Sequence, residues 1–133
     1  MSQENLEIVR QNIEAFQDGR FDSVVELWDA EGEWIPAMAG AVDDRVYRGH
    51  AALRRYFEEF FASFSEVRLH DVAFRNLGER VLVLYRLSVR GRNSEVTVGQ
   101  PGGTVYELSG GKIVRGLSYL SEAEALKAVG LVE

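Results

Sequence analysis

Residues 50–64 read HAALRRYFEEFFASF, and the spacing of their apolar side chains decides much of the fold. The apolar positions recur at steps of three and four, which is the period of one face of a helix. Five aromatic rings share this face, so we expect the helix that starts near His50 to be the most deeply packed of the protein. The stripe consists of Leu53, Tyr56, Phe57, Phe60, Phe61 and Phe64.

Two helices are expected before this aromatic helix. Residues 3–18 repeat apolar side chains at helical spacing, and Gly19 follows at the position of a left-handed C-cap. Residues 21–28 predict a shorter helix, for which Ser23 and Glu26 have the spacing of a capping box.

The second half of the chain predicts strands. The apolar phase slips at His70 and Asp71, which indicates a β-bulge. Residues 99–103, rich in glycine and containing a proline, are expected to interrupt one strand. Ser121 and Glu124 predict a capped final helix. The strands are expected over residues 33–36, 67–74, 81–90, 95–108 and 113–120, with a loop over residues 37–46 and a strand stub at residues 46–49.

Length and composition support a single domain over residues 1–133. The chain is 46% hydrophobic and 27% charged, which suits one core that buries roughly two-thirds of the unfolded surface. Hairpin connections predict antiparallel pairing, so the fold class is α+β. Helices on one face of a strongly bent sheet can leave a blind, conical cavity, and the glycines and the bulge supply the bending.

Composition excludes several classes of function. The chain has no cysteine, which removes a disulfide scaffold, a thiolate zinc site and a cysteine nucleophile. Its net charge is −6 and its bases are scattered, so we expect no nucleic-acid partner. The first 12 residues lack the pattern of a signal peptide, and no apolar run is long enough for a membrane span. We therefore expect a cytoplasmic protein with no membrane partner.

Three stretches are typical of one known superfamily. They are EW at residues 33–34, YRGH at residues 47–50, and GKIVRGLSYL at residues 111–120 with the tail EALKAVGL at residues 124–131. In these stretches the chain resembles the NTF2-like superfamily and, within it, the bacterial SnoaL-like (ketosteroid-isomerase-like) domains. The resemblance implies a cone in which three N-terminal helices cover one face of a strongly bent antiparallel sheet. It implies little about activity, because this superfamily carries unrelated functions on one frame.

Two activities within the superfamily can be compared with the residues present. Ketosteroid isomerases need a carboxylate base, a phenol and a protonated acid, and by resemblance these positions fall near Pro36, Asn12 and Gly103. None of these side chains can do this chemistry, so we expect that activity to be absent. SnoaL-type cyclases use a carboxylate beside a histidine. The histidines here are His50 and His70, and no acid clearly pairs with either.

Other residues have both a functional and a structural interpretation. Glu33 is the acid best placed for a general base near a cavity mouth, or it makes a surface salt bridge. His50 can donate to a ligand or cap its helix. Arg86 favours an anionic or carbonyl ligand if its strand face lines the cavity, and otherwise faces solvent or a partner subunit. Two isolated histidines give no case for a metal, and no motif indicates a cofactor.

We therefore expect a domain that binds a small hydrophobic molecule. By analogy with the superfamily, the enzymatic activity to expect is an isomerase- or cyclase-like reaction of a carbonyl metabolite. The alternative is a non-catalytic dimerisation module whose pocket is filled or vestigial. By comparison with the superfamily, Arg115, Leu117 and Tyr119 face a partner subunit in a homodimer. The expected ligand contacts are Asn12, Trp28, Trp34, Met38, Tyr47, Phe57, Phe61, Arg86 and Gln100. For the apolar residues of this set, a place in the core is nearly as consistent with the sequence.

Overall fold

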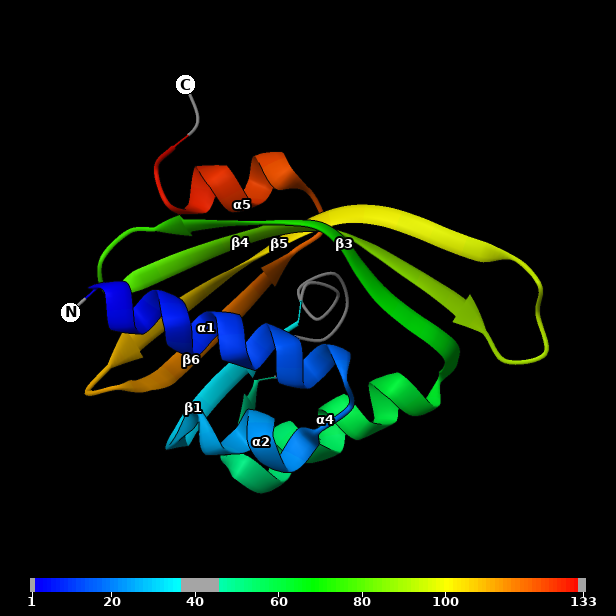
Figure 1. Cartoon of the computed structure of the whole chain (residues 1–133), viewed down its shortest axis with the longest axis horizontal. Helices are drawn as coiled ribbons and strands as arrows, with labels where there is room; N and C mark the ends of the chain where they lie inside the picture. Colours follow the sequence, from blue (N-terminus) through cyan, green and yellow to red (C-terminus); the bar gives the residue numbers. More distant parts are fainter. Residues whose placement is uncertain (1, 37–45, 132–133) are drawn as a thin grey trace.

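A six-stranded sheet in the order β2-β1-β6-β5-β4-β3 carries helices on both faces. The computed structural model describes residues 2–36 and 46–131 (Figure 1). Its elements are α1 (Ser2–Gln17), α2 (Phe21–Glu26), β1 (Trp28–Ile35), β2 (Tyr47–Arg48), α4 (His50–Ala62), β3 (Phe64–Asn76), β4 (Arg80–Gly91), β5 (Thr97–Ser109), β6 (Lys112–Tyr119) and α5 (Glu122–Ala128).

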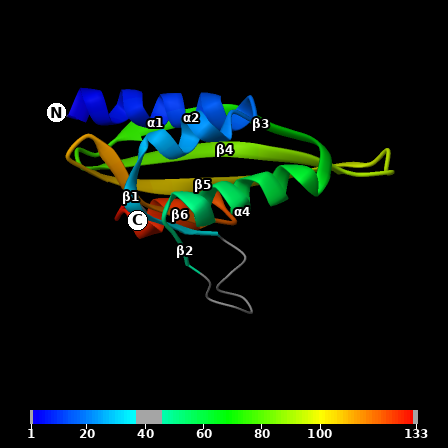
Figure 2. The same cartoon turned by 90° about the horizontal axis from the view of Figure 1, so that it is seen from below.

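The sheet is mixed and strongly bent. Strands β3 to β6 pair antiparallel, as expected, whereas β1 pairs parallel with β6. The helices α1, α2 and α4 lie on one side of the sheet, which we call the concave face, and α5 lies on the other, the convex face (Figure 1). Seen from below, the β4–β5 hairpin extends past the ends of α1 and α4 (Figure 2). This arrangement confirms the α+β cone with three N-terminal helices on one face.

The predicted bulge in β3 is confirmed, and it explains the phase slip in the sequence. The register of β3 against β4 shifts between His70 and Ala73, and Asp71 has a φ of 53°. Val67 pairs with Val89 before the shift, and Phe74 pairs with Val83 after it. Because Val83 and Val89 share one face of β4, the bulge keeps the apolar side chains of both halves of β3 on the concave face.

The predicted end of α1 at Gly19 and the predicted side-chain cap at the start of α5 are also confirmed. Gly19 has a φ of 72° and its N–H donates to the Phe16 carbonyl, as in a left-handed helix end. The Ser121 side chain accepts a hydrogen bond from the Glu124 N–H at the start of α5.

The second helix is shorter than its apolar spacing predicts. It ends at Glu26, and Trp28 begins β1 instead of closing the helix. The Ile113 N–H donates to the Leu27 carbonyl, so pairing with β6 replaces the helical turn at this point. The predicted capping box is not used either, because the N-cap is Arg20 and no side chain caps the helix. Strand β1 is correspondingly longer than the predicted residues 33–36.

Strand β5 is continuous, in contrast to the predicted interruption at residues 99–103. Its pairing with β4 runs without a break from Thr97 to Glu107. The pairing between β5 and β6 reaches from Ser109 to Gly103 of β5 and does not include Pro101. On the side of β5 that faces β6, Pro101 therefore lies at an open edge. A proline without an N–H is tolerated at such an edge.

The core is built around two indole rings of β1 and a glycine of β6. Trp28 and Trp34 are 1% and 8% exposed, and their ring centroids lie 6.3 Å apart in an edge-to-face arrangement. Both rings cover Gly116, where an added Cβ atom would lie 2.9 Å from an atom of each ring. Strand β6 can therefore approach β1 only because residue 116 has no side chain.

Two buried polar residues tie α1 and β5 into this core. The Asn12 Nδ2 group donates to the Tyr106 hydroxyl over 3.3 Å, and the Asn12 Oδ1 atom accepts from the Trp28 Nε1–H over 2.9 Å. The Thr104 hydroxyl interacts with Tyr106 and forms a 2.9 Å hydrogen bond with the Tyr85 hydroxyl. Burial, the main cause, raises the pKa of Tyr106 well above its usual range.

In the described residues, no helix is long and apolar enough to cross a membrane.

Gly116→Ala is expected to destabilise the fold. The new methyl group would overlap both indole rings, and overpacking of this kind costs about 1–3 kcal/mol. Gly99→Ala, in β5, is the matched control, because its Cβ atom would meet only side-chain atoms of Arg86 and Ser88 at 3.5 Å or more. Urea unfolding of both variants measures the difference, and equal midpoints would show that the indole rings do not confine residue 116.

Tyr106→Phe is expected to reduce the decrease in the free energy of unfolding at alkaline pH. Because burial raises the pKa of Tyr106, the unfolded chain releases this proton first, above its ordinary pKa of 10.0. The contribution of Tyr106 to stability is therefore complete below about pH 10 and falls by about 1.4 kcal/mol per pH unit above it. Urea unfolding between about pH 8 and 11 should give a flatter profile for the variant. Tyr119→Phe controls for the loss of one phenol, and an unchanged profile in Tyr106→Phe would refute the assignment.

Candidate functional site

On the concave face, the sheet continues beyond the part that the helices cover (Figure 2). Val81 and Val83 of β4 are buried against α1, α2 and α4 in the main core. The next residues on the same face of β4 are only half-buried, although most of them are apolar. The first packs against the edge of the core, and the others lie beyond it. In chain order, these residues are Tyr85, Leu87 and Val89, and β3 adds Leu69 beside Leu87.

Several predicted ligand contacts lie together at the inner end of this face. Trp34 packs against Phe57 of α4 with ring centroids 5.6 Å apart, and Trp28 lies next to Trp34. Tyr47 of β2 pairs with Trp34 in register and is half-buried. Trp28, Trp34 and Phe57 are thus core residues, and their contact with a ligand stays a prediction. Met38 lies outside the described residues.

Asn12 is fully engaged in holding the core. Its amide donates to Tyr106 and accepts from Trp28, so both ends of the side chain are already bonded within the protein. This position was predicted to offer a polar contact to a ligand, and in the structure it connects α1 to β1 and β5.

Trp34 carries an unpartnered donor in the same region. Its Nε1 atom is buried, and among the described residues it has no hydrogen-bond partner. Leaving a buried N–H without an acceptor costs about 1–3 kcal/mol. The Tyr56 hydroxyl comes closest to being a partner, because the Trp34 N–H acts on it as a weak hydrogen-bond donor outside ideal geometry. Burial, the main cause, raises the pKa of Tyr56, and the indole N–H opposes this effect in part.

Arg86 and Gln100 do not join this group. Leu82 and Leu84 on the strand face of Arg86 pack against α5, and a Cβ atom added at Gly99 would lie 3.5 Å from Arg86 Nε. Arg86 is therefore exposed on the convex face, which corrects the idea that its face lines a cavity. Gln100 is exposed on β5, where it donates to the Leu120 carbonyl over 3.3 Å.

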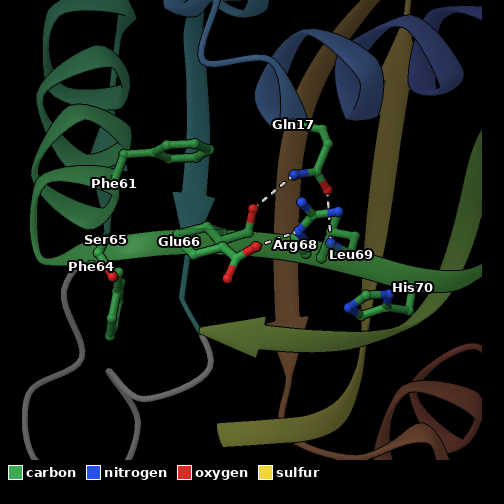
Figure 3. A pocket seen from close by; sticks show the side chains of 9 residues that line it. Gln17, Phe61, Phe64, Ser65, Glu66, Arg68, Leu69 and His70 are labelled. Carbon is green, nitrogen blue, oxygen red and sulfur yellow. Dashed lines mark hydrogen bonds and ion pairs between the residues drawn. The ribbon is translucent and has the colours of Figure 1, made fainter. Parts of the chain in front are cut away.

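Phe61 lies one helical turn beyond Phe57 on the same face of α4, and Phe16 contacts both rings. The Phe61 ring packs against Phe16 and Phe21, at centroid distances of 5.1 and 5.2 Å. It also lines an open hollow of about 470 Å³ along the edge strand β3 (Figure 3). Within this hollow the Gln17 side chain donates to the Val67 carbonyl and accepts from the Leu69 N–H.

The hollow at the edge of β3 is largely polar and internally paired. Arg68 bonds to Glu66 within it, and His70 lies farther along the same strand (Figure 3). The Gln17 amide occupies two backbone groups of the open strand edge, which shields that edge from pairing with another chain. This hollow therefore has a structural explanation.

The titratable candidates have structural roles as well. Glu33 forms an ion pair with Arg48 and lies 3.9 Å from Arg115, facing away from Trp34 on the convex side. A general-base role for Glu33 at the concave face is thus excluded by its direction. One ring nitrogen of His50 lies 2.8 Å from the Trp28 carbonyl, to which it can only donate.

Carboxylates are absent from the buried interior of the described chain. There, the buried polar residues are Asn12 and Thr104. A Cβ atom at Gly103 would contact Ala125 of α5, so this position faces the convex side and not the interior. Its neighbours Gly102 and Thr104 face inward, and neither can supply an acid. The described residues also contain no cluster of three acidic or histidine side chains suited to a metal ion.

Tyr56, Tyr85 and Leu87 lie on the concave face and were not among the predicted contacts. The sequence did contain the signal for each. Tyr56 belongs to the aromatic stripe of α4, and Tyr85 and Leu87 alternate in phase with Val81 and Val83. Alternation separates the two faces of a strand but does not say which one meets the helices.

A search of curated proteins returned no match. Crystal structures with a similar fold include TerC co-crystallized with polyporic acid, at 17% identity and a TM-score of 0.77, covering 93% of this chain and 96% of TerC. A polyketide cyclase assigned as putative, from Xanthomonas campestris pv. campestris, is 20% identical, with coverage of 96% and 98% and a TM-score of 0.77. An NTF2-like protein of unknown function from Burkholderia pseudomallei is 21% identical, with coverage of 96% and 98% and a TM-score of 0.78.

At these identities the structures establish the fold and leave the activity open. The family comparison reaches further, because the SnoaL-like domain model matches residues 9–116, most of the chain. The expected resemblance is thereby confirmed. The chain belongs to the SnoaL-like domain family and is a ligand-binding domain of that type, with the NTF2-like fold and an unspecified activity.

Proposed function

We propose that this protein binds a small, mainly apolar molecule on the concave face, between α4 and the outer halves of β3, β4 and β5. The observation that carries the proposal is the half-buried apolar surface that continues outward from the core on the concave face of β3 and β4. Leu87 exemplifies it, since it points to the same side as the buried Val81 and Val83 but lies beyond the core that they share.

The apolar side chains of this surface are in part exposed to water. Burying such side chains contributes about 25 cal/mol for each square ångström removed from water. An aromatic or polycyclic ligand can remove this surface from water without any change of the backbone. The co-crystallization of one structural relative with polyporic acid is consistent with a ligand of this size class.

As an enzyme, the protein would catalyse an isomerase- or cyclase-like reaction of a carbonyl compound. The described interior contributes hydrogen-bond donors and no carboxylate. The chain would therefore act on such a compound mainly by positioning it and by stabilising charge on an oxygen atom.

Leu87→Glu is expected to weaken ligand binding at least tenfold, because it places a carboxylate on the apolar surface. A panel of steroids, polyketides and aromatic acids can be screened by thermal shift. A ligand at 100 times its dissociation constant adds about 2.7 kcal/mol of stability, and one bound tenfold more weakly adds about 1.4 kcal/mol.

Ser88→Glu is the matched control for this test. Ser88 is the next residue of β4 and lies on the convex face, so the same charge is introduced on the opposite side of the same strand. We expect its ligand-induced stabilisation to equal that of the wild type. If no member of the panel stabilises the wild type, or if both variants bind equally well, the concave face is not the binding surface.

We also propose a homodimer through the convex face of β6. Arg115 and Leu117 are half-buried there, and Tyr119 packs against α5. The Arg115 Nε atom is buried and lies 3.9 Å from a carboxylate oxygen of Glu33, while the rest of this side chain is partly exposed and can contact a second subunit. This surface also serves the alternative function, a non-catalytic dimerisation module, which the half-buried Leu117 favours.

Leu117→Asp is expected to convert the dimer into a monomer, because it buries a carboxylate in an apolar interface. Light scattering coupled to size-exclusion chromatography measures the mass of both forms. Val96→Asp is the control, since Val96 is an exposed apolar residue in the β4–β5 turn. A monomeric wild type would contradict the proposed dimer and leave the ligand proposal unaffected.

A further inference from the structure

A helix covers only one part of the convex face. Helix α5 lies over β4 and β5, where Ala125 and Val129 pack against Leu82 and Val105 (Figure 1). The described helices that contact β1 and β2 do so from the concave side. We call the convex-facing residues of β1, β2 and β6 the bare surface: Glu33, Ile35, Arg48, Arg115 and Leu117.

The bare surface combines an apolar pair with a row of charges. Ile35 and Leu117 pair in register, and both are half-buried. Glu33 pairs in register with Arg48 on one side and with Arg115 on the other. The two arginine side chains are 63% and 43% exposed, whereas Glu33 between them is 24% exposed. The bare surface therefore offers a partner an apolar pair beside an excess of exposed positive charge.

Helix α5 carries complementary groups that its own copy does not use. Leu120 and Leu131, just outside its two ends, are 44% and 37% exposed. Glu122 and Glu124 of the first turn are exposed, and no ion pair within the described part of the chain uses them. The single base of the helix, Lys127, lies in the last turn. The end of α5 next to Leu120 is therefore both negatively charged and partly apolar.

A second copy can bring these groups to the bare surface. Ala125 and Val129 face the sheet of their own copy, so the opposite side of α5 points away from that sheet. Because α5 stands out from the convex face (Figure 1), two convex faces cannot close directly over each other. A two-fold axis removes this obstacle if it places α5 of each copy against the part of the partner that has no helix. A two-fold contact is isologous, so the arrangement forms twice in one dimer.

We propose that in the homodimer α5 of each copy packs on the bare surface of the other copy. Leu120 and Leu131 supply apolar cover for Leu117, and the acids of the first turn approach the partner's Arg48 and the partner's Arg115. This inference rests on the proposed homodimer. It adds the surface that the partner uses and the relative orientation of the two copies.

Cross-linking tests the orientation, because the chain has no cysteine of its own. Arg48→Cys and Glu124→Cys are prepared separately, refolded together and treated with a short bismaleimide. We expect a covalent dimer on a denaturing gel from the mixture and none from either variant alone. Arg48→Cys mixed with Glu95→Cys, in the β4–β5 turn, is the control and should give none. If Arg48→Cys does not fold, Val46→Cys takes its place, since Val46 is 49% exposed beside β2.

A charge reversal tests the complementarity. Glu124→Lys should raise the dissociation constant of the dimer about tenfold at low salt, because it replaces attraction to the partner's arginines by repulsion. The effect should shrink at high salt, where exposed charges are screened. Glu124 caps the helix through its backbone N–H, which the substitution keeps. Glu95→Lys makes the same change in an exposed turn and should leave the dissociation constant unchanged. Sedimentation velocity measures all three proteins.

The possible failures are distinguishable. A monomeric wild type refutes the homodimer, and the orientation is refuted with it. If the wild type is a dimer that Leu117→Asp dissociates, but the mixture gives no cross-link and Glu124→Lys behaves like Glu95→Lys, the orientation is refuted and the β6 contact stands. A cross-link of Glu124→Cys with itself, and none with a cysteine at residue 46 or 48, also refutes the orientation.

Discussion

The parallel contact between β1 and β6 is the constraint on which the rest of the structure depends. It joins the helical first half of the chain to the last strand of the sheet, and it requires two indole rings to pack against a backbone position with no side chain. Gly116 provides that space, and an added Cβ atom there would lie 2.9 Å from both rings. Because the positions of Trp28 and Trp34 are fixed in this way, Asn12 of α1 and Phe57 of α4 have defined surfaces to bond and pack against.

The same packing explains why the concave face has two different halves. Near β1 and β6, the indole rings and the helices fill the space, and the side chains of β4 are fully buried. Farther along β4, the strands extend past α1 and α4 (Figure 2). Leu87 and Val89 are only half-buried there. The filled core at one end and the apolar surface at the other are the features on which the proposed ligand site rests. The Trp34 N–H and the Tyr56 hydroxyl lie at the inner, filled end of this face.

Polar groups in the interior separate into satisfied and unsatisfied sets. Asn12, Thr104, Tyr106 and the Trp28 N–H form a connected network that satisfies its own members and links α1 to β5. Such a network stabilises one packing arrangement, because breaking any link leaves a buried group without a partner. The Trp34 N–H stands outside it. The titratable groups predicted from sequence as chemical candidates, Glu33 and His50, instead make structural contacts with Arg48 and with the Trp28 carbonyl.

The sequence by itself determined the aromatic helix, the strand order along the chain, the bulge at His70 and Asp71, and the capped last helix. These features depend on local spacing and on short-range hydrogen bonds, which residues a few positions apart can specify. Only the tertiary structure decided that Trp28 belongs to a strand, that β5 runs unbroken through residues 99–103, and that Leu87 rather than Arg86 faces the helices. Each of these outcomes depends on a partner far away in the chain. Pairing with β6 ends the helix before Trp28, pairing with β4 carries β5 past its glycines, and the side of the sheet on which α1 and α4 dock gives the two faces of β4 their different roles.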